Sequence, residues 1–410
     1  MRHLPAGARR AGTRLAIVLA AASLAAAACG SPSTGTSDSG PLTPDKVPAK
    51  PSKAVSLNIL DVAGNLQLTK GMLDDFKKEH PDIVATIVTS TGKAPDLAGK
   101  VKAQEDANHV DISLVLTGTD GLSAGIAQNL WTKITPDYAS KLSNMDNYTD
   151  PAKAMQELAQ GYGVELVQYP SGPLIEYNPA KVTSPPTSAQ ELLAWAKAHP
   201  GKFEYAVPKN SGPGRTLLMG LPYILGDSNP KDPDKGWDKT WTYLAELGKY
   251  VKTYQAGTSN TMKDLASGAV DMIASTTGWD INPRALGTVP NTMKITTLKG
   301  FHWVNDAQYA VVPKGVSADT MSAIVNLLQF MLTPKEQAIA FDQGYFYPGP
   351  AIKGVTLDMA PAASRTAIQK YGRPEYEQLI TSVPNETSLP ADQQVAAFAK
   401  WDQLIGAKAK

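Results

Sequence analysis

Short apolar runs alternate with helix-like stretches from about residue 54 onward. Residues 56–62 hold four large apolar side chains and read as a buried strand. Leu68, Met72 and Phe76 then recur every four residues, which is the spacing of one helix face, and the helix must end before Pro81. The regular part of the chain therefore begins with a strand followed by a helix.

The same order repeats over the next 40 or so residues. Residues 83–88 and 112–116 read as strands, and Leu97 and Val101 mark a helix between them, with Pro95 near its start. Parallel strands need a crossover and helices are the usual crossover, so the alternation predicts a mostly parallel sheet. Solutes bind such sheets at the carboxyl ends of the strands. The candidate loops are therefore residues 61–65, 89–93 and 117–120.

A second unit begins near residue 164. Residues 164–177 alternate in polarity, and Ser188 and Glu191 have the spacing of a capping box at the start of a helix. Strands are then expected at residues 203–207, 270–275 and 308–312, and helices around residues 217–225, 241–251 and 262–267. The predicted fold class is α/β, with residues 54–165 and 305–345 forming one lobe, residues 166–304 a second lobe, and residues 346–410 helices that pack on both.

The N-terminus has the pattern of an export signal. Four arginines lie within the first 14 residues, residues 15–28 form an apolar run, and Cys29 follows immediately. Fourteen residues are too few to span a membrane, which takes about 20. The alanines before Cys29 and the Gly30-Ser31 pair after it resemble a bacterial lipoprotein box, although Ala26 stands where a leucine is usual. We therefore expect a signal peptide over residues 1–28 and lipid attachment at Cys29; an ordinary signal peptide with a stray cysteine is the alternative.

Residues 30–53 are rich in Ser, Thr, Gly, Pro and Lys and hold few apolar side chains. Such a composition predicts an unfolded segment. As a flexible coil it would reach roughly 25–30 Å. Residues 29–53 are thus interpreted as a lipidated cysteine with a tether that holds the folded part near the outer face of a cell membrane; a plain disordered terminus is the alternative.

Charge and cysteine content exclude several classes of protein. The formal charge is +1, and it is −3 once the four arginines of the export signal are set aside. A nucleic-acid binder needs a dense basic face, so that class is not expected. Cys29 is the only cysteine, so no disulfide can form within the chain, and neither a cofactor nor a metal site is predicted.

Three stretches resemble the extracellular solute-binding proteins that feed ATP-binding-cassette (ABC) importers. They are residues 262–271, residues 309–315 with the helices and the Gly-Tyr-Phe-Tyr-Pro sequence up to 348, and residues 175–179 with the capped helix that follows. The resemblance is to the larger two-crossover class, which includes polyamine, iron, thiamine and oligosaccharide binders. It implies a two-lobed periplasmic-binding-protein-like fold of type II, a monomer without enzyme activity, and a solute held in a hinged cleft and delivered to a permease. Crossing segments are expected near residues 165–177 and 297–305.

Candidate ligand contacts follow from the expected loops. We select polar and aromatic residues from the first lobe, the second lobe and the return path: Asp61, Asn65, Thr117, Thr119, Asp120, Tyr169, Ser211, Arg215, Trp279, Asp280, Trp303, Asn305, Asp306 and Tyr345. Trp279 beside Asp280 is the favoured pair, because a ring face next to a carboxylate suits a sugar or an alkylammonium group. Core packing of the Trp, an N-cap role for Asp120 and a structural ion pair for Arg215 stay open as alternatives.

The solute itself is predicted from charge. Four candidate acids, Asp61, Asp120, Asp280 and Asp306, face two candidate bases, Arg215 and Lys93, which predicts an acidic cleft. A polyamine or another organic cation is therefore favoured, with a sugar, a thiamine-like compound and, through Tyr345 and Tyr347, ferric iron as alternatives. An exported hydrolase and a purely structural lipoprotein are the other classes considered; neither a G-x-S-x-G nor an H-E-x-x-H motif is present.

Overall fold

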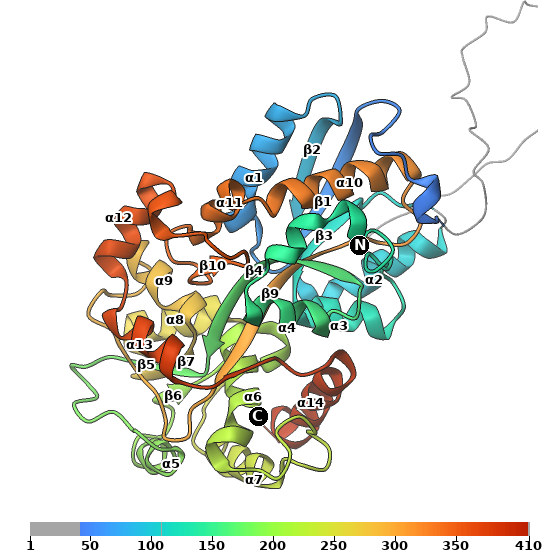
Figure 1. Ribbon diagram of the computed structural model, residues 1–410. Coiled ribbons are helices and arrows are strands. Elements are labelled where there is room, and N and C mark those ends of the chain that lie inside the picture. Colours follow the sequence, from blue (N-terminus) through green and yellow to red (C-terminus); the bar gives the residue numbers. More distant parts are fainter. Residues whose placement is uncertain (1–41, 108, 409–410) are drawn as a thin grey trace, which may run out of the picture. The chain divides into compact units, whose positions relative to one another are not determined.

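Two β-sheets organise the chain. The computed structural model describes residues 42–107 and 109–408, which belong to one compact unit (Figure 1). One sheet has seven strands in the order β10-β4-β9-β3-β1-β2, with β11 paired to β9; the other has four in the order β6-β7-β5-β8. We call them the large sheet and the small sheet.

The element bounds are as follows. The large sheet contains β1 (Val55–Asp61), β2 (Val84–Thr91), β3 (Leu114–Gly118), β4 (Gly163–Gly172), β9 (Trp303–Val311), β10 (Gly349–Pro350) and β11 (Asn385–Glu386). The small sheet contains β5 (Leu174–Tyr177), β6 (Phe203–Glu204), β7 (Met272–Ser275) and β8 (Lys294–Thr296). The α-helices are α1 (Leu66–Glu79), α2 (Ala94–Asp106), α3 (Thr119–Ala127), α4 (Asp150–Leu158), α5 (Ala189–Ala198), α6 (Gly212–Leu225), α7 (Asp238–Leu247), α8 (Thr258–Ser267), α9 (Ile281–Ala285), α10 (Ala318–Met331), α11 (Pro334–Gln337), α12 (Ala362–Tyr371), α13 (Pro374–Ser382) and α14 (Ala391–Leu404). Short 3-10 helices include η1 (Pro44–Lys46), η4 (Pro208–Asn210), η5 (Thr277–Trp279) and η6 (Ala338–Phe341).

The large sheet is covered on both faces. Leu57 and Ile59 of β1 pack in one apolar cluster with side chains of α1 and α10, whereas Leu60 packs in another cluster with side chains of α2 and α3. Successive strand residues point to opposite faces, so a strand buried on both sides must be apolar at nearly every position. This accounts for the apolar Leu57, Ile59 and Leu60 of β1, while Ser56 and Asn58, near the start of the strand, are exposed.

The small sheet is built in the same way. Ala274 of β7 faces a cluster that includes Leu192 of α5 and Leu217 of α6, while Ile273 faces Met262 of α8. Trp131, Trp237 and Trp241 are all buried. The α/β fold class is thus confirmed.

Strand direction departs from the prediction. The pairs β1–β2 and β1–β3 are parallel, but β3–β9, β4–β9 and β5–β7 are antiparallel. The expectation of mostly parallel sheets is therefore wrong. The reason is that β4 leads out of the large sheet and β9 leads back into it, so these strands cannot all run the same way.

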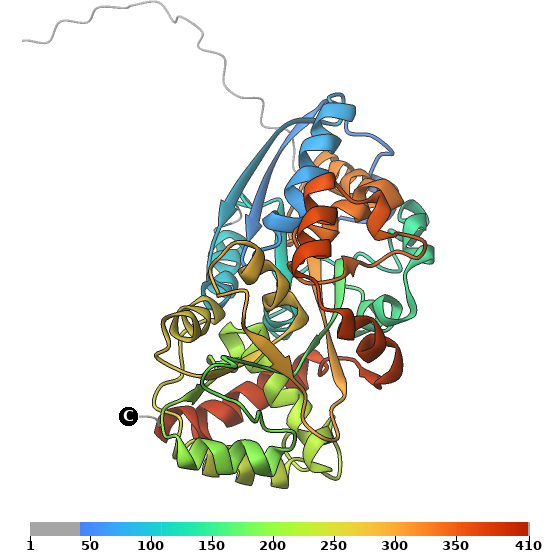
Figure 2. The same cartoon turned by 90° about the vertical axis from the view of Figure 1, so that its left-hand side faces the viewer.

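The chain passes between the sheets through β4 and β9, which lie side by side in Figures 1 and 2. From β4 it enters the small sheet at β5 after Gly172 and Pro173, and from β8 it returns to the large sheet at β9. The lobe boundary expected at residues 165/166 falls inside β4, so residues 166–172 belong to the large sheet.

Residues 42–53 are folded, contrary to the prediction of a tether over residues 30–53. Val47 is buried in the core of the large sheet, and its carbonyl accepts a hydrogen bond from Lys141 Nζ at 2.8 Å. Ser52 Oγ donates to Asp319 of α10 at 2.5 Å, and Asn326 of the same helix donates to the Ala49 carbonyl at 2.9 Å. Burial of Val47 and these three bonds outweigh the polar composition. Residues 1–41, including Cys29 and the expected signal peptide, lie outside the described residues.

The C-terminal part contacts both sheets' helices. Strand β11 pairs with the start of β9, and α12 packs on α9. Helix α14 packs on α3 beside the large sheet, where Gln394 donates to Ser123 at 3.3 Å. Its other end places Trp401 in the apolar cluster of the small sheet, with the indole N–H donating to Tyr205 at 3.1 Å. Residues 391–404 therefore bridge the two halves of the fold.

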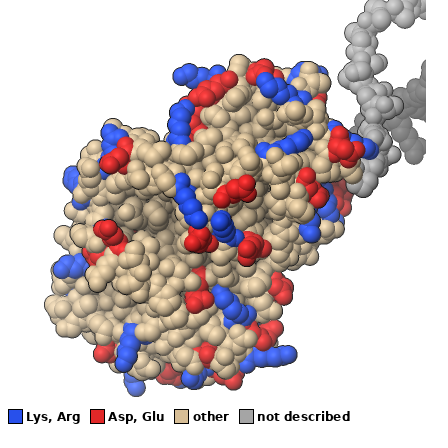
Figure 3. All heavy atoms as spheres, viewed as in Figure 1, with Lys and Arg blue, Asp and Glu red and all other residues tan. Residues whose placement is uncertain are grey.

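Charged side chains of both signs are interspersed over the face shown in Figure 3. That face does not carry the dense basic surface of a nucleic-acid binder. None of the described helices combines the length and the apolar character needed to cross a bilayer.

A buried carboxyl group lies at the edge of the small sheet. Glu204 of β6 is buried beside Asp264 of α8, and Gln255 donates to Asp264 at 2.5 Å. Burial, followed by the charge of Asp264, raises the pKa of Glu204 to about 8. The group is therefore protonated in the folded chain at neutral pH.

This shift predicts a pH-dependent stability. In the unfolded chain Glu204 ionises near its ordinary pKa of about 4.5, but in the folded chain only near 8, so stability falls as the pH rises between these values and then levels off. Glu204→Gln removes the ionising group. Near pH 4 the free energy of unfolding of this variant should equal that of the wild type. By pH 8.5 it should exceed the wild-type value by at least about 1 kcal/mol, measured by urea unfolding. Glu157→Gln, at an exposed position of α4, is the control. A constant difference across this range would contradict the prediction.

Candidate functional site

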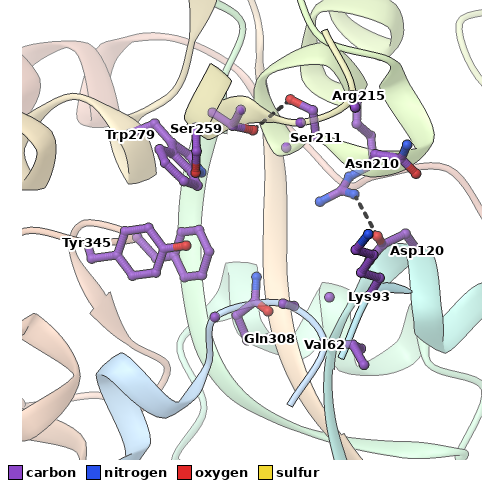
Figure 4. Close-up of a pocket in the computed structure, with 18 of the residues that line it drawn as sticks. Val62, Lys93, Asp120, Asn210, Ser211, Arg215, Ser259, Trp279, Gln308 and Tyr345 are labelled. Atoms are coloured by element: carbon purple, nitrogen blue, oxygen red, sulfur yellow. Dashed lines mark hydrogen bonds and ion pairs between the residues drawn. The ribbon is translucent and has the colours of Figure 1, made fainter. Parts of the chain in front are cut away.

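A cavity of about 580 Å³ lies between the large and the small sheet (Figure 4). One side is formed by residues that follow β1, β2 and β3, together with β4, β9 and the turn after η6; the other is formed by η4, α6, the residues around the start of α8, and η5. The volume is in the range of small-molecule sites.

The strand ends of the large sheet supply one wall as expected. Val62, Ala63 and Gly64 follow β1, Gly92 and Lys93 follow β2, and Gly118 and Asp120 lie at the end of β3. All three predicted loops therefore reach the cavity. Gly64 has a φ of +77°, and a Cβ there would approach the Tyr345 hydroxyl to 2.8 Å, so a glycine is required at this turn.

Aromatic rings line one end of the cavity. Trp279 meets Tyr345 edge-on with ring centroids 5.5 Å apart, and Tyr345 stacks on Phe346 at 4.0 Å. Phe346 in turn stacks on Tyr169 at 4.7 Å. Trp279 is only partly buried, whereas the other three rings are buried. Trp279 thus offers more ring surface to a solute than its three neighbours.

Charged groups lie at the opposite end (Figure 4). Arg215 of α6 pairs with Asp306 of β9, with 2.5 Å between guanidinium nitrogen and carboxylate oxygen, and lies 3.8 Å from Asp120. Asp306 also accepts hydrogen bonds from the Tyr169 hydroxyl at 3.0 Å and the Thr119 hydroxyl at 3.1 Å. Asp306 is fully enclosed, so Arg215 and Asp120 are the members of this ion-pair group that line the cavity.

The environment of Asp120 differs from that of Asp306. Burial raises the pKa of Asp120, while the charge of Arg215 lowers it and that of Asp306 raises it further. The backbone N–H groups of Gly121 and Asp120 at the start of α3 also lower the pKa of this carboxyl. The N-cap role considered for Asp120 is wrong, because Gly118 is the N-cap residue of α3 and Asp120 lies in the first turn of that helix.

Two helix N-termini open on the cavity from the small-sheet side. Ser211 caps α6 by accepting from the Gly214 N–H at 3.2 Å, and its hydroxyl lies 2.8 Å from the Thr258 hydroxyl at the start of α8. The residue before α8 is Gly257, which has no side chain to cap that helix. Gln308 and Asn210 add further polar groups to the lining.

Six of the fourteen predicted contacts line the cavity: Asp120, Tyr169, Ser211, Arg215, Trp279 and Tyr345. Five others lie just behind it. Asp61 accepts from the backbone N–H groups of Ala63, Asn65 and Leu66 at 2.9–3.1 Å and so holds the start of α1. Asn65 donates to Gln308 at 3.0 Å; Thr119 and Asp306 are the buried partners already described, and Thr117 is fully buried.

Asp280 does not line the cavity, so the favoured Trp279–Asp280 pair is wrong. Its carboxylate is fully buried and bonded to Arg284 at 3.1 Å, to Arg373 at 2.6 Å and to the Tyr376 hydroxyl at 2.7 Å. Trp279 points into the cavity (Figure 4), whereas the Asp280 side chain joins Arg284 of α9 to Arg373 and Tyr376 at the start of α13. Asp280 is a structural ion-pair residue.

Trp303 and Asn305 also lie away from the cavity. Trp303 is buried beside Phe301 and Tyr376, and its indole N–H donates to the Leu379 carbonyl at 3.0 Å. Asn305 is buried, and its backbone carbonyl accepts from Ser388 at 2.7 Å. Both residues are on β9, close to where β11 pairs with it, so the C-terminal segment covers them.

Several lining residues were missed as individual contacts. They are Gln308, Asn210, Phe346 and residues 256–260. Phe346 directly follows the predicted Tyr345, and residues 256–260 precede a helix whose start was expected only at Met262. If the start of that helix is placed at Gly257 instead of Met262, the sequence predicts that residues 256–260 lie at a helix start.

The prediction of an acidic cleft is also wrong. Of its four acids, only Asp120 lines the cavity, because Asp61, Asp280 and Asp306 are buried on internal partners. Both predicted bases, Lys93 and Arg215, do line it. The expected surplus of negative charge is therefore absent from the described lining.

Comparison with known proteins identifies the family. Residues 71–370 match the sequence pattern of the bacterial extracellular solute-binding proteins. The chain belongs to this family. No curated protein sequence matches the chain.

Solved structures share the fold of this solute-binding protein. An ABC transporter structure from Clostridium perfringens has a TM-score of 0.61 at 15% identity, and the match covers 86% of this chain and all of that one. A spermidine/putrescine ABC transporter substrate-binding protein from Streptococcus pneumoniae gives 0.58 at 14%, covering 86% and 99%. A periplasmic binding protein from Actinobacillus pleuropneumoniae with bound fructose 6-phosphate gives 0.57 at 14%, covering 86% and 98%. These matches establish the periplasmic-binding-protein-like architecture.

No group of three or more metal-ligating His, Cys, Asp or Glu side chains occurs among the described residues. Tyr345 lines the cavity, but Tyr347 packs near Tyr376, with 6.3 Å between ring centroids, so the two tyrosines considered for iron do not meet there.

The two carboxylates beside Arg215 should respond differently to substitution. Asp306→Asn leaves a buried arginine without its main partner and should lower the free energy of unfolding by about 3–5 kcal/mol. Asp120→Asn should change it by less than about 1 kcal/mol, because its carboxylate lies 3.8 Å from Arg215, beyond hydrogen-bond distance, and Arg215 keeps Asp306 as its main partner. Urea unfolding of both variants at pH 7 tests the contrast, and equal losses would refute the assignment of Asp306 as the structural partner.

Proposed function

We propose that this protein is the substrate-binding component of an ABC importer, which captures a small polar solute in the cavity between the sheets. The observation that carries the proposal is the composition of the cavity wall, to which both halves of the fold contribute aromatic and polar groups. Family membership and the shared architecture support it. Delivery to permease subunits is part of the proposal.

The connections between the sheets suit closure by hinge motion. The chain passes between them through the short segment between β4 and β5 and through the segment between β8 and β9. A solute that touches both walls binds the closed arrangement better and shifts the population toward it. A Kd of about 1 μM corresponds to roughly 8 kcal/mol, which a few hydrogen bonds and a ring contact at Trp279 can supply.

The range of solutes remains broad at this level. The sequence favoured a polyamine or another organic cation. Asp120 and the aromatic rings of the cavity still support this class, but Asp280 does not line the cavity and no longer supports it. A sugar is supported by the same rings and by the amides of Asn210 and Gln308. The related structures include one named for spermidine and putrescine and one holding fructose 6-phosphate, so they do not select a class.

An exported hydrolase is the alternative of another class. Cleavage of a glycosidic bond by two carboxylates requires both to flank one bond. Among the described residues that line the cavity, Asp120 is the single carboxylate, and none is a histidine. These observations favour binding without turnover.

Solute capture should stabilise the protein and make it more compact. A screen of polyamines, thiamine, sugars, sugar phosphates and small carboxylates should give a hit that raises the Tm, and the same hit should reduce the radius of gyration in small-angle X-ray scattering. Trp279→Ala should weaken binding at least about tenfold, because it removes the exposed ring face. Trp195→Ala, a partly exposed ring on α5 outside the cavity, is the matched control. Turnover of a hit, or no hit at all, would contradict the proposal.

Location at the outer face of a bacterial membrane completes the proposal. The family is extracellular, and Cys29 follows an apolar run with the pattern of a lipoprotein signal. Residues 42–53 are folded and so are not part of the proposed tether, and residues 30–41 lie outside the described residues. We further propose that the protein acts as a monomer, as the resemblance to the solute-binding class implies.

Cys29→Ser should release the protein from membranes. The thiol is the acceptor of the lipid, so the variant should move from the membrane pellet to the medium. Ser31→Ala, two residues further on, leaves the cysteine intact and should stay in the pellet. Retention of Cys29→Ser in the membrane fraction would rule out this anchor.

A further inference from the structure

The two ends of the cavity differ in chemistry. Figure 4 shows Trp279 and Tyr345 on one side and Arg215, Asp120 and Lys93 on the other, with the space between them unobstructed by labelled side chains. A solute that fills this space must present a ring-like or flat part to the first group and a polar head to the second. The sign of charge at the polar end determines which head fits.

Formal charges at the polar end cancel. Lys93 and Arg215 are positive, Asp120 is negative, and Asp306 lies directly behind Arg215 as its buried negative partner. Asp120 is thus offset by Lys93, for which the described residues offer no ion-pair partner. Side-chain charge alone does not call for a cationic head.

Backbone N–H groups at the helix N-termini favour a negatively charged head group. Helices α6 and α8, of 14 and 10 residues, both begin at the cavity, and α8 follows Gly257 without a side-chain cap. A helix N-terminus acts roughly as half a positive charge. By contrast, Asp61 and Asp120 already occupy the N-termini of α1 and α3. The two helix starts on the small-sheet side together provide the equivalent of about one positive charge.

Arg215 supplies a second, independent sign of a ligand, one that accepts hydrogen bonds. Its side chain is 95% buried and lines the cavity, yet its Nε–H has no hydrogen-bond partner among the described residues. One amino group is bonded to Asp306, while the other is 3.8 Å from Asp120, which is beyond hydrogen-bond distance. An arginine carries five N–H donors, and an unpaired buried donor is costly unless a ligand accepts from it.

We propose that the solute is a small monocarboxylate with a flat, unsaturated part, its carboxylate held between Arg215, Lys93 and the starts of α6 and α8, and its flat part against Trp279. This inference rests on the proposed function and names the solute class for the same cavity. A single negative charge matches the two helix N-termini. A doubly charged phosphate would carry more negative charge than the two helix N-termini offset. A polyamine would place its positive charge beside the positive ends of these helices.

The proposal is tested with ligands that differ only in the head group. Matched sets of 3-phenylpropionate, its primary amide and 3-phenylpropylamine, and of indole-3-acetate, its amide and tryptamine, are titrated into the full chain by calorimetry, alongside spermidine, thiamine, glucose and fructose 6-phosphate. The carboxylate of a set should bind at least about tenfold more tightly than its amide, and the amine should bind most weakly. The affinity of the carboxylate should fall as salt rises.

Substitutions of the charged cavity residues should change the affinities for carboxylate and amine ligands in opposite directions. Asp120→Asn should tighten carboxylate binding about two- to tenfold and weaken amine binding, because it removes a negative charge at the polar end. Lys93→Gln should weaken carboxylate binding about two- to fivefold. Lys77→Gln, exposed on α1 outside the cavity, removes the same charge and should leave affinity unchanged. Neither cavity variant disturbs the Arg215–Asp306 pair, so both should fold.

The outcomes separate the inference from the proposed function. Tighter binding of an amine, spermidine, thiamine, the sugar or the sugar phosphate, or equal binding of carboxylate and amide, would overturn the monocarboxylate while leaving a solute-binding protein. Weaker carboxylate binding in Asp120→Asn would overturn it too. A chain that binds no member of the whole panel would overturn the proposed function, and the solute class with it.

Discussion

The buried ion pair between Arg215 and Asp306 fixes the relation between the two sheets at the cavity. Asp306 belongs to β9 of the large sheet, and Arg215 belongs to α6, which packs on the small sheet. Burying two charges is expensive unless further hydrogen bonds satisfy them, and Tyr169 and Thr119 do so for the carboxylate. Tyr169 in turn stacks on Phe346, so one pair of charges positions both the polar and the aromatic end of the cavity.

Local sequence patterns were sufficient to predict the first three strands of the large sheet and the loops at their carboxyl ends. Residues 56–62, 83–88 and 112–116 predicted β1, β2 and β3 to within three residues at each end, and their carboxyl ends do line the cavity. These elements succeed because β3 and the second half of β1 are buried and apolar, whereas β2, an edge strand that is exposed along most of its length, is predicted less closely at its end. Where the chain crosses between sheets, the local pattern says nothing about direction, so the antiparallel pairing of β4 and β9 was missed.

The site depended on partners that lie far away in the sequence. Asp280 has the same local setting as a ligand residue, a strand end beside an exposed ring, but Arg373, 93 residues further on, encloses it. Arg215 and Asp306 are 91 residues apart, and Ser52 is 267 residues from Asp319. A strand end can be predicted from its own residues, whereas the exposure of a carboxylate there depends on which distant segment packs over it.

Helix α14 links distant residues to the strength of solute binding. It contacts α3 through Gln394 and the core of the small sheet through Trp401, so a hinge motion that changes the distance between these elements must loosen one of the two contacts. The free energy of that contact enters the equilibrium between open and closed forms, and apparent affinity scales with the fraction of molecules in the binding-competent form. Substitutions on α14 can therefore retune affinity during evolution while every cavity residue, and hence solute selectivity, stays the same.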